Sequence, residues 1–167
     1  MRVRTVLVVA ALLLVALVIQ TTLFSQTAAF EPDLVMLVVI LLALTRLRPE
    51  VVLGVAFLSG LVVDLLGTSV LGLRAIVFTV VGYLALRTRE RADLGRIATG
   101  LWAGLLTLAA MILLILIGTL FGQTGLLGDG VFDLLLLVPL ANAVLAWIFA
   151  PLVVRLIDRD TTAFRYA

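Results

Sequence analysis

Six apolar stretches, separated by short polar joints, cover most of this 167-residue chain. The longest, residues 97–121, contains no charged side chain, and a helix that crosses a bilayer needs roughly 20 apolar residues. Hydrophobic residues make up 64% of the sequence, whereas soluble domains contain about 45–50%. A soluble domain of this length could not bury so much apolar surface, so the chain is predicted to be an integral membrane protein.

The runs predict an all-α membrane protein, a compact six-helix transmembrane bundle forming a single polytopic domain over residues 1–167. The expected helices cover approximately residues 5–24, 28–45, 50–66, 70–86, 97–121 and 131–154. The first run could instead be a cleaved signal peptide, which would leave five helices; we favour an uncleaved first helix.

The second apolar run, residues 34–44, is too short to cross a hydrocarbon core of about 30 Å. It must either extend backward through Pro32 or form a short helix buried among the others. Pro32 suits the first turn of a helix, where its missing N–H would have no partner. Asp33 suits the positive end of the helix dipole.

The arginines predict the orientation. With six spans and a cytoplasmic N-terminus, eleven of the twelve arginines lie on the cytoplasmic side, and only Arg74 lies outside. Cytoplasmic loops of membrane proteins carry such an excess, so both termini are expected on the cytoplasmic side of the membrane. The pI of about 9.9 does not indicate nucleic-acid binding, because the arginines cluster in short joints, as in loops that face anionic lipid.

The residue types that the chain lacks exclude most catalytic mechanisms and metal sites. The chain has no His and no Cys, and all its cationic side chains are Arg. The usual general base, thiol nucleophile and zinc ligands are therefore missing. Ser59 and Ser69 have no evident base to activate them. We expect a protein that is not an enzyme, with no cofactor and no metal site.

Asp64 is the most informative charge, because a carboxylate within a span is costly and often marks function. Ala56, Gly60 and Asp64 recur every fourth residue and share one helix face, where small residues let another helix approach closely. An ion pair between Asp64 and Arg74 is a reasonable hypothesis. The alternative is that Asp64 simply reaches water at the outer headgroups.

Other polar and small residues suggest packing sites. Gly100 and Gly104 form a GxxxG motif that could seat another helix, and internal packing is the favoured explanation. Pro139 and Asn142 interrupt the sixth run. Transporters use broken helices at substrate sites, but one proline and one asparagine more often reflect packing. Gln20, at the end of the first helix, can hydrogen-bond across helices.

Four short motifs carry a family resemblance: Gln20-Thr21-Thr22-Leu23, Pro32-Asp33-Leu34, residues 60–67 (GLVVDLLG) and Leu71-Gly72-Leu73. In order and spacing the chain resembles the rod shape-determining protein MreD family. The resemblance implies a non-enzymatic component of the bacterial cell-elongation complex, which works with MreC, MreB, RodA and a class B penicillin-binding protein. It also implies a fold similar to the substrate-binding subunits of energy-coupling-factor transporters. Candidates for a pocket or partner surface are Gln20, Pro32, Asp33, Gly60, Asp64, Gly67, Gly72 and Arg74.

Two functions from different classes remain open at this point. The favoured one is a scaffold that binds the transmembrane helix of an MreC-like single-span protein within the lipid bilayer. The alternative is the substrate-binding membrane subunit of a small-molecule, vitamin-type transporter. That function requires several polar groups near the outer face, which Gln20, Asp33, Asp64 and Arg74 could supply.

Overall fold

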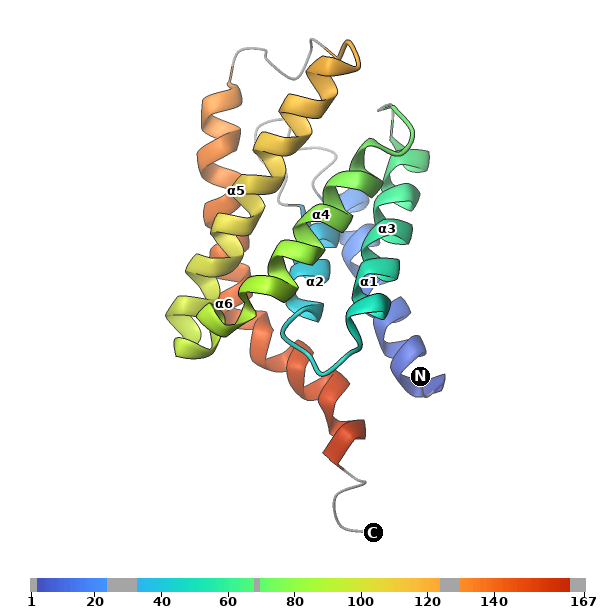
Figure 1. The fold of residues 1–167 in the computed structure, drawn as a ribbon, viewed down its shortest axis with the longest axis vertical. Helices are drawn as coiled ribbons and strands as arrows, with labels where there is room; N and C mark the ends of the chain where they lie inside the picture. The colour runs from blue at the N-terminus through green and yellow to red at the C-terminus, as the bar shows by residue number, and fades with distance from the viewer. Residues whose placement is uncertain (1–2, 24–32, 68–69, 124–129, 163–167) are drawn as a thin grey trace.

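The computed structural model describes residues 3–23, 33–67, 70–123 and 130–162. These residues form six α-helices and a short 3-10 helix, with no β-strand in the described ranges (Figure 1). The elements are α1 (Val3–Leu23), α2 (Leu34–Leu42), α3 (Pro49–Leu66), α4 (Leu73–Thr88), η1 (Arg89–Leu94), α5 (Arg96–Leu120) and α6 (Val131–Thr162). The all-helical architecture expected from the sequence is therefore confirmed.

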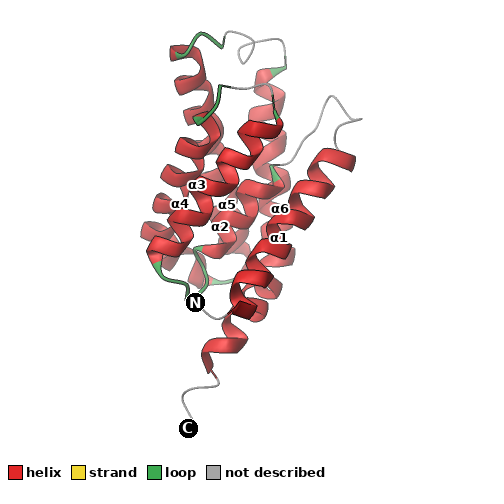
Figure 2. Ribbon diagram, turned by 90° about the vertical axis from the view of Figure 1, so that its right-hand side faces the viewer, coloured by secondary structure: helices red, strands yellow, loops and turns green. Residues whose placement is uncertain are grey.

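Successive helices run in alternating directions, so the start of α1 and the end of α6 lie at the same end of the bundle (Figures 1 and 2). This arrangement brings most arginines of the described helices and joints to that end, which we call the arginine-rich end. They are Arg4, Arg46, Arg48, Arg87, Arg89, Arg91, Arg96 and Arg155. Arg74, at the start of α4, lies at the opposite end.

Four of the helices are long and apolar enough to cross a membrane: α1, α3, α5 and α6. The other two are shorter than the sequence suggested, since α2 has 9 residues and α4 has 16. At 1.5 Å per residue, α2 is only about 14 Å long. The structure thus supports six helices but only four candidate spans by length and composition.

Helix α2 is the short buried helix that the sequence left as an alternative. Seven of its nine residues are buried, among them Val39, Ile40 and Leu42, which have no exposed surface. It contacts every other α-helix of the bundle, so it forms the centre of the core. Pro32 lies outside the described residues. The expected span over 28–45 is too long at its C-terminal end, because the helix ends at Leu42.

Two helix pairs pack closely because glycines remove the side chain at the crossing. A Cβ atom added to Gly60 of α3 would lie 2.6 Å from the Cα atom of Ala75 in α4. A Cβ atom on Gly100 of α5 would lie 2.8 Å from the carbonyl oxygen of Ala143 in α6. The GxxxG motif is therefore used inside the molecule, since Gly104 also approaches Pro139 and Ala143.

Helices α4 and α5 meet at the arginine-rich end and diverge toward the opposite end (Figure 1). The indole N–H of Trp102 donates a hydrogen bond to the hydroxyl of Thr88 at 2.9 Å, which joins the two helices where they meet. This geometry positions the pocket described below.

Candidate functional site

The N-terminus of α2 is capped by two side chains from different elements. Asp33 is the N-cap residue, and its Oδ1 accepts the main-chain N–H of Met36 at 3.0 Å. Oε1 of Gln20, from α1, accepts the N–H groups of Leu34 at 3.1 Å and Val35 at 3.3 Å. The first N–H groups of a helix have no partner within it. Gln20 and Asp33 therefore supply, from outside the helix, the partners that this buried terminus needs.

Gln20 also shows that α1 belongs to the bundle. Its side chain completes the capping of α2, and α1 packs against α2 and α6. Gln20 thus links α1 to the N-terminus of α2, while the retention of an uncleaved first helix stays a prediction.

An ion pair joins α4 to the same terminus. Nη1 of Arg74 lies 3.2 Å from Oδ2 of Asp33. The two side chains are 29% and 14% exposed, respectively, so the pair is only partly shielded from solvent and adds modestly to stability. Its main effect is geometric, because it holds a guanidinium beside the positive end of α2.

Asp64 caps α4 rather than α2. Its Oδ2 accepts the main-chain N–H groups of Gly72 at 2.9 Å, Arg74 at 3.0 Å and Ala75 at 3.3 Å. The carboxylate is 2% exposed. The predicted ion pair between Asp64 and Arg74 is wrong: Asp64 accepts the main-chain N–H of Arg74, while the guanidinium pairs with Asp33. The alternative of a headgroup-facing Asp64 is wrong, because the side chain is buried.

Asn142 of α6 joins this region to α5. Its Nδ2 donates to the main-chain oxygen of Asp33 at 3.3 Å and to Oγ1 of Thr107 at 3.2 Å. The residue is completely buried, and its Oδ1 has no hydrogen-bond partner among the described residues. Asn142 and Thr107 thus form a polar contact in an otherwise apolar interior, directly behind the N-terminus of α2.

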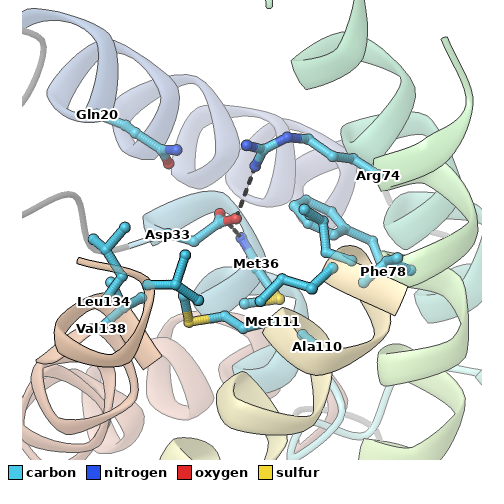
Figure 3. Close-up of a pocket in the computed structure, with 13 residues that line it drawn as sticks. Gln20, Asp33, Met36, Arg74, Phe78, Ala110, Met111, Leu134 and Val138 are labelled. Carbon is cyan, nitrogen blue, oxygen red and sulfur yellow. Dashed lines mark hydrogen bonds and ion pairs between the residues drawn. The ribbon is translucent and has the colours of Figure 1, made fainter. Parts of the chain in front are cut away.

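A cavity of about 230 Å³ lies beside Gln20, Asp33 and Arg74, and Figure 3 shows the residues that line it. Its polar wall consists of Gln20, Asp33 and Arg74. The remaining lining is apolar and comes from α2, α4, α5 and α6. These residues are Met36, Val77, Phe78, Ala110, Met111, Leu114, Ile115, Val131, Leu134 and Val138. We call this space the amphipathic pocket.

A second hollow, which we call the apolar groove, lies between α1 and α3 and has a volume of about 460 Å³. Its lining is almost entirely aliphatic, with Ser59 as the polar exception. Helix α2 contributes Val35 to its base. The lining residues of α1 are Val6, Val9, Ala10, Leu13, Leu14 and Leu17, and those of α3 are Val51, Val55, Leu58, Ser59 and Val62.

Of the predicted site residues, the structure brings together Gln20, Asp33 and Arg74. Pro32 lies outside the described residues, and Gly60 and Asp64 hold the packing and capping positions given above. Gly67 is the C-cap of α3, and Gly72 is the N-cap of α4 with φ at +92°, a left-handed conformation that favours glycine. Sequence reasoning missed Thr107, the aromatic and methionine lining of the pocket, and the whole apolar groove. The heptad-like spacing of the groove residues was a signal that could have identified the last of these.

The described residues contain no cluster of three or more acidic side chains that could hold a metal ion. The polar wall of the amphipathic pocket offers hydrogen bonds and one guanidinium. It has no nucleophile paired with a base. The arrangement is therefore suited to binding and to helix packing.

Comparison with known proteins gives one informative match. No curated protein and no solved structure matches the chain, so the similarity to energy-coupling-factor subunits stays a prediction. The family described as rod shape-determining protein MreD matches residues 1–159, nearly the full length. This chain belongs to the rod shape-determining protein MreD family.

Proposed function

We propose that the chain is a multi-pass scaffold of the bacterial plasma membrane that holds the transmembrane helix of an MreC-like single-span protein in its apolar groove. Through that partner it would help to position MreB, RodA and a class B penicillin-binding protein during side-wall synthesis. The family supports a role in rod shape determination, and the arginine-rich end supports a cytoplasmic location for both termini.

The spacing of the groove residues carries the proposal. On α1 the groove is lined by Val6, Ala10, Leu13 and Leu17, and on α3 by Val51, Val55, Leu58 and Val62. Both sets follow a four-three-four spacing, which is the a and d pattern by which one helix packs against another. Two such seams that face one groove form a surface on which a third helix can pack along its length.

The size and composition of the groove agree with a helix as the occupant. From Val6 to Leu17 the α1 seam covers about three helical turns, a substantial part of a bilayer crossing. Ala10 and Ser59 are small, so an approaching backbone can come close, as at helix interfaces within membranes. Leu14 and Leu58 are 62% and 61% exposed, and a partner helix would cover them.

Site-specific disulfide crosslinking tests the proposal directly, because the chain has no native cysteine. We would introduce Leu13→Cys or Leu58→Cys and pair each with single cysteines along the transmembrane helix of the MreC-like partner in cells. Crosslinks should appear at every third or fourth partner position, since one face of a helix would contact the groove.

The matched control is Leu105→Cys, which is 67% exposed on α5, outside the groove lining. Equal crosslinking from Leu105→Cys and Leu58→Cys would show that the groove is not the docking surface. The cellular readout is shape: Ala10→Trp should round rod-shaped cells, as depletion of the protein would, while Leu105→Trp should leave them rods. Normal rods with Ala10→Trp at wild-type protein levels would contradict the proposal.

A further inference from the structure

We infer that the amphipathic pocket binds a lipid of the outer leaflet. The acceptor oxygens of the lipid headgroup would lie at Gln20 and Arg74, and the first part of one acyl chain would lie between α4 and α5. This inference does not depend on the scaffold role, because it concerns a different cavity and a different class of partner.

Among the described residues, the polar wall keeps donors on Gln20 and Arg74 that no described contact uses. Oε1 of Gln20 already accepts two main-chain N–H groups, which assigns the other end of the amide as its NH₂ group. That nitrogen lies on the Arg74 side of the pocket (Figure 3). Arg74 has five N–H donors, and its bond to Asp33 is made by Nη1. The pocket therefore matches a ligand that presents acceptor oxygens, such as a phosphate or an ester.

The charges of the polar wall point the same way. The guanidinium of Arg74 and the carboxylate of Asp33 offset each other, since they form an ion pair at 3.2 Å. The N-terminus of α2 adds no free donor at Leu34, Val35 or Met36, because Gln20 and Asp33 already accept these N–H groups. The remaining attraction for acceptor oxygens comes from the guanidinium donors of Arg74 that Asp33 does not engage.

The rest of the pocket is apolar and suits an acyl chain. Phe78 of α4 and Met111 and Leu114 of α5 form apolar walls below the polar groups. Two methionines, Met36 and Met111, give the lining adaptable side chains. The volume of about 230 Å³ is below the roughly 300–1,000 Å³ of sites that enclose a whole drug-sized ligand. The pocket can thus hold part of one chain, while the remainder stays in the bilayer.

In this inference the lipid enters from the bilayer between α4 and α5. These two helices contribute facing sides of the pocket, and they separate toward the end at which Arg74 lies (Figure 1). Arg74 starts the first turn of α4, at the level of the outer interface, while Phe78 lies one turn deeper. A lipid with its head at Arg74 and its chain toward Phe78 has the orientation of the outer leaflet.

The test measures the thermal stability of delipidated full-length protein in detergent as dioctanoyl phosphatidylglycerol is added. Wild-type protein should show a saturable rise in Tm, because a ligand that binds only the folded state stabilises it. Leu114→Trp fills the pocket and should raise the half-saturating lipid concentration by about tenfold or more. The matched control Leu116→Trp, on the exposed side of the same helix, should behave as wild type.

A further measurement distinguishes a lipid from a soluble anion that carries the same acceptor oxygens. Glycerol 3-phosphate supplies the acceptor head without a chain, and we expect no Tm shift from it. An equal shift from glycerol 3-phosphate would reveal a site for a soluble anion and overturn the lipid assignment. Equal lipid responses of Leu114→Trp and Leu116→Trp, or no response of the wild type, would overturn it as well.

A second pair of variants tests the inference independently, in case Leu114→Trp does not fold. Leu134 of α6 lines the pocket, whereas Leu136 is 71% exposed. Native mass spectrometry of protein released from phosphatidylglycerol nanodiscs should detect a retained lipid on wild type and Leu136→Trp. Leu134→Trp should lose it, and retention of the same lipid by Leu134→Trp would contradict the inference.

Discussion

Replacing Asp64 by alanine should destabilise the protein more than the loss of any exposed charge. Three main-chain N–H groups at the start of α4 donate to this carboxylate, which is 2% exposed. Hydrogen bonds to charged groups contribute about 1.5–3 kcal/mol each. Because all three share Oδ2, their contributions do not add fully. We expect a loss of about 3–5 kcal/mol, the range for removing one partner of a buried charged contact.

Two variants sharpen this prediction. Asp64→Asn keeps an acceptor oxygen that can occupy the place of Oδ2 but loses the charge, so it should cost only about 1–2 kcal/mol. Asp133→Ala is the matched control, because this acidic residue is exposed in the first turn of α6 and helix-dipole contributions there are about 0.3–1 kcal/mol. The assay is unfolding by SDS in mixed micelles, followed by far-ultraviolet circular dichroism.

The double change distinguishes the two forms of contact between Asp64 and Arg74. If the guanidinium were the partner of Asp64, Arg74→Ala would relieve part of the damage caused by Asp64→Ala. The structure leads us to expect no relief, because Arg74→Ala keeps the main-chain N–H and also leaves Asp33 without its ion pair. Relief in the double variant, or a cost for Asp64→Ala within about 0.5 kcal/mol of the Asp133→Ala control, would refute the reasoning.

Three further predictions concern packing and backbone geometry, each measured in the same unfolding assay. Gly60→Ala should lower the free energy of unfolding by about 1–3 kcal/mol, because the added methyl group pushes α3 away from α4. Gly54→Ala is the control and should be neutral or stabilising, since Gly54 has open space around it. Equal effects of the two changes would contradict the close crossing of α3 and α4. Gly72→Ala should lower the free energy of unfolding by about 1–2 kcal/mol, because a φ of +92° is strained for a residue with a Cβ atom. No loss of stability would show that this turn does not require the left-handed conformation. Asn142→Leu and Thr107→Val should show a coupling of about 0.6–1.7 kcal/mol in a double-mutant cycle, and strict additivity would exclude their hydrogen bond.

The polar residues of the sequence pointed to the right region but to some wrong partners. Gln20, Asp33, Asp64 and Arg74 were candidates for a polar group near the outer face, and all of them except Asp64 line one pocket. Asp64 was expected beside the guanidinium of Arg74, yet it caps the main chain of α4 instead. Side-chain identity does not reveal such a contact, because a carboxylate accepts equally from a guanidinium and from main-chain N–H groups.

Helix lengths show a similar limit. Hydropathy located all six helices, but it could not decide whether residues 34–44 formed part of a span or a short buried helix. The outcome depends on the capping of α2 by Gln20 and Asp33, which come from different segments. Burial by every other α-helix then makes a helix of nine residues stable. Both conditions are tertiary, so no local pattern could supply them.

The sequence by itself determined that the chain is a helical membrane protein and that most of its arginines lie on one side. These properties follow from local composition, since hydrocarbon excludes charge and requires main-chain groups to be satisfied within each helix. Only the tertiary structure decided which polar side chains meet at the N-terminus of α2, and where α4 and α5 diverge to leave a pocket. Such features arise from contacts between residues distant in sequence, as between Asp33 and Asn142, whose meeting depends on how the whole bundle packs.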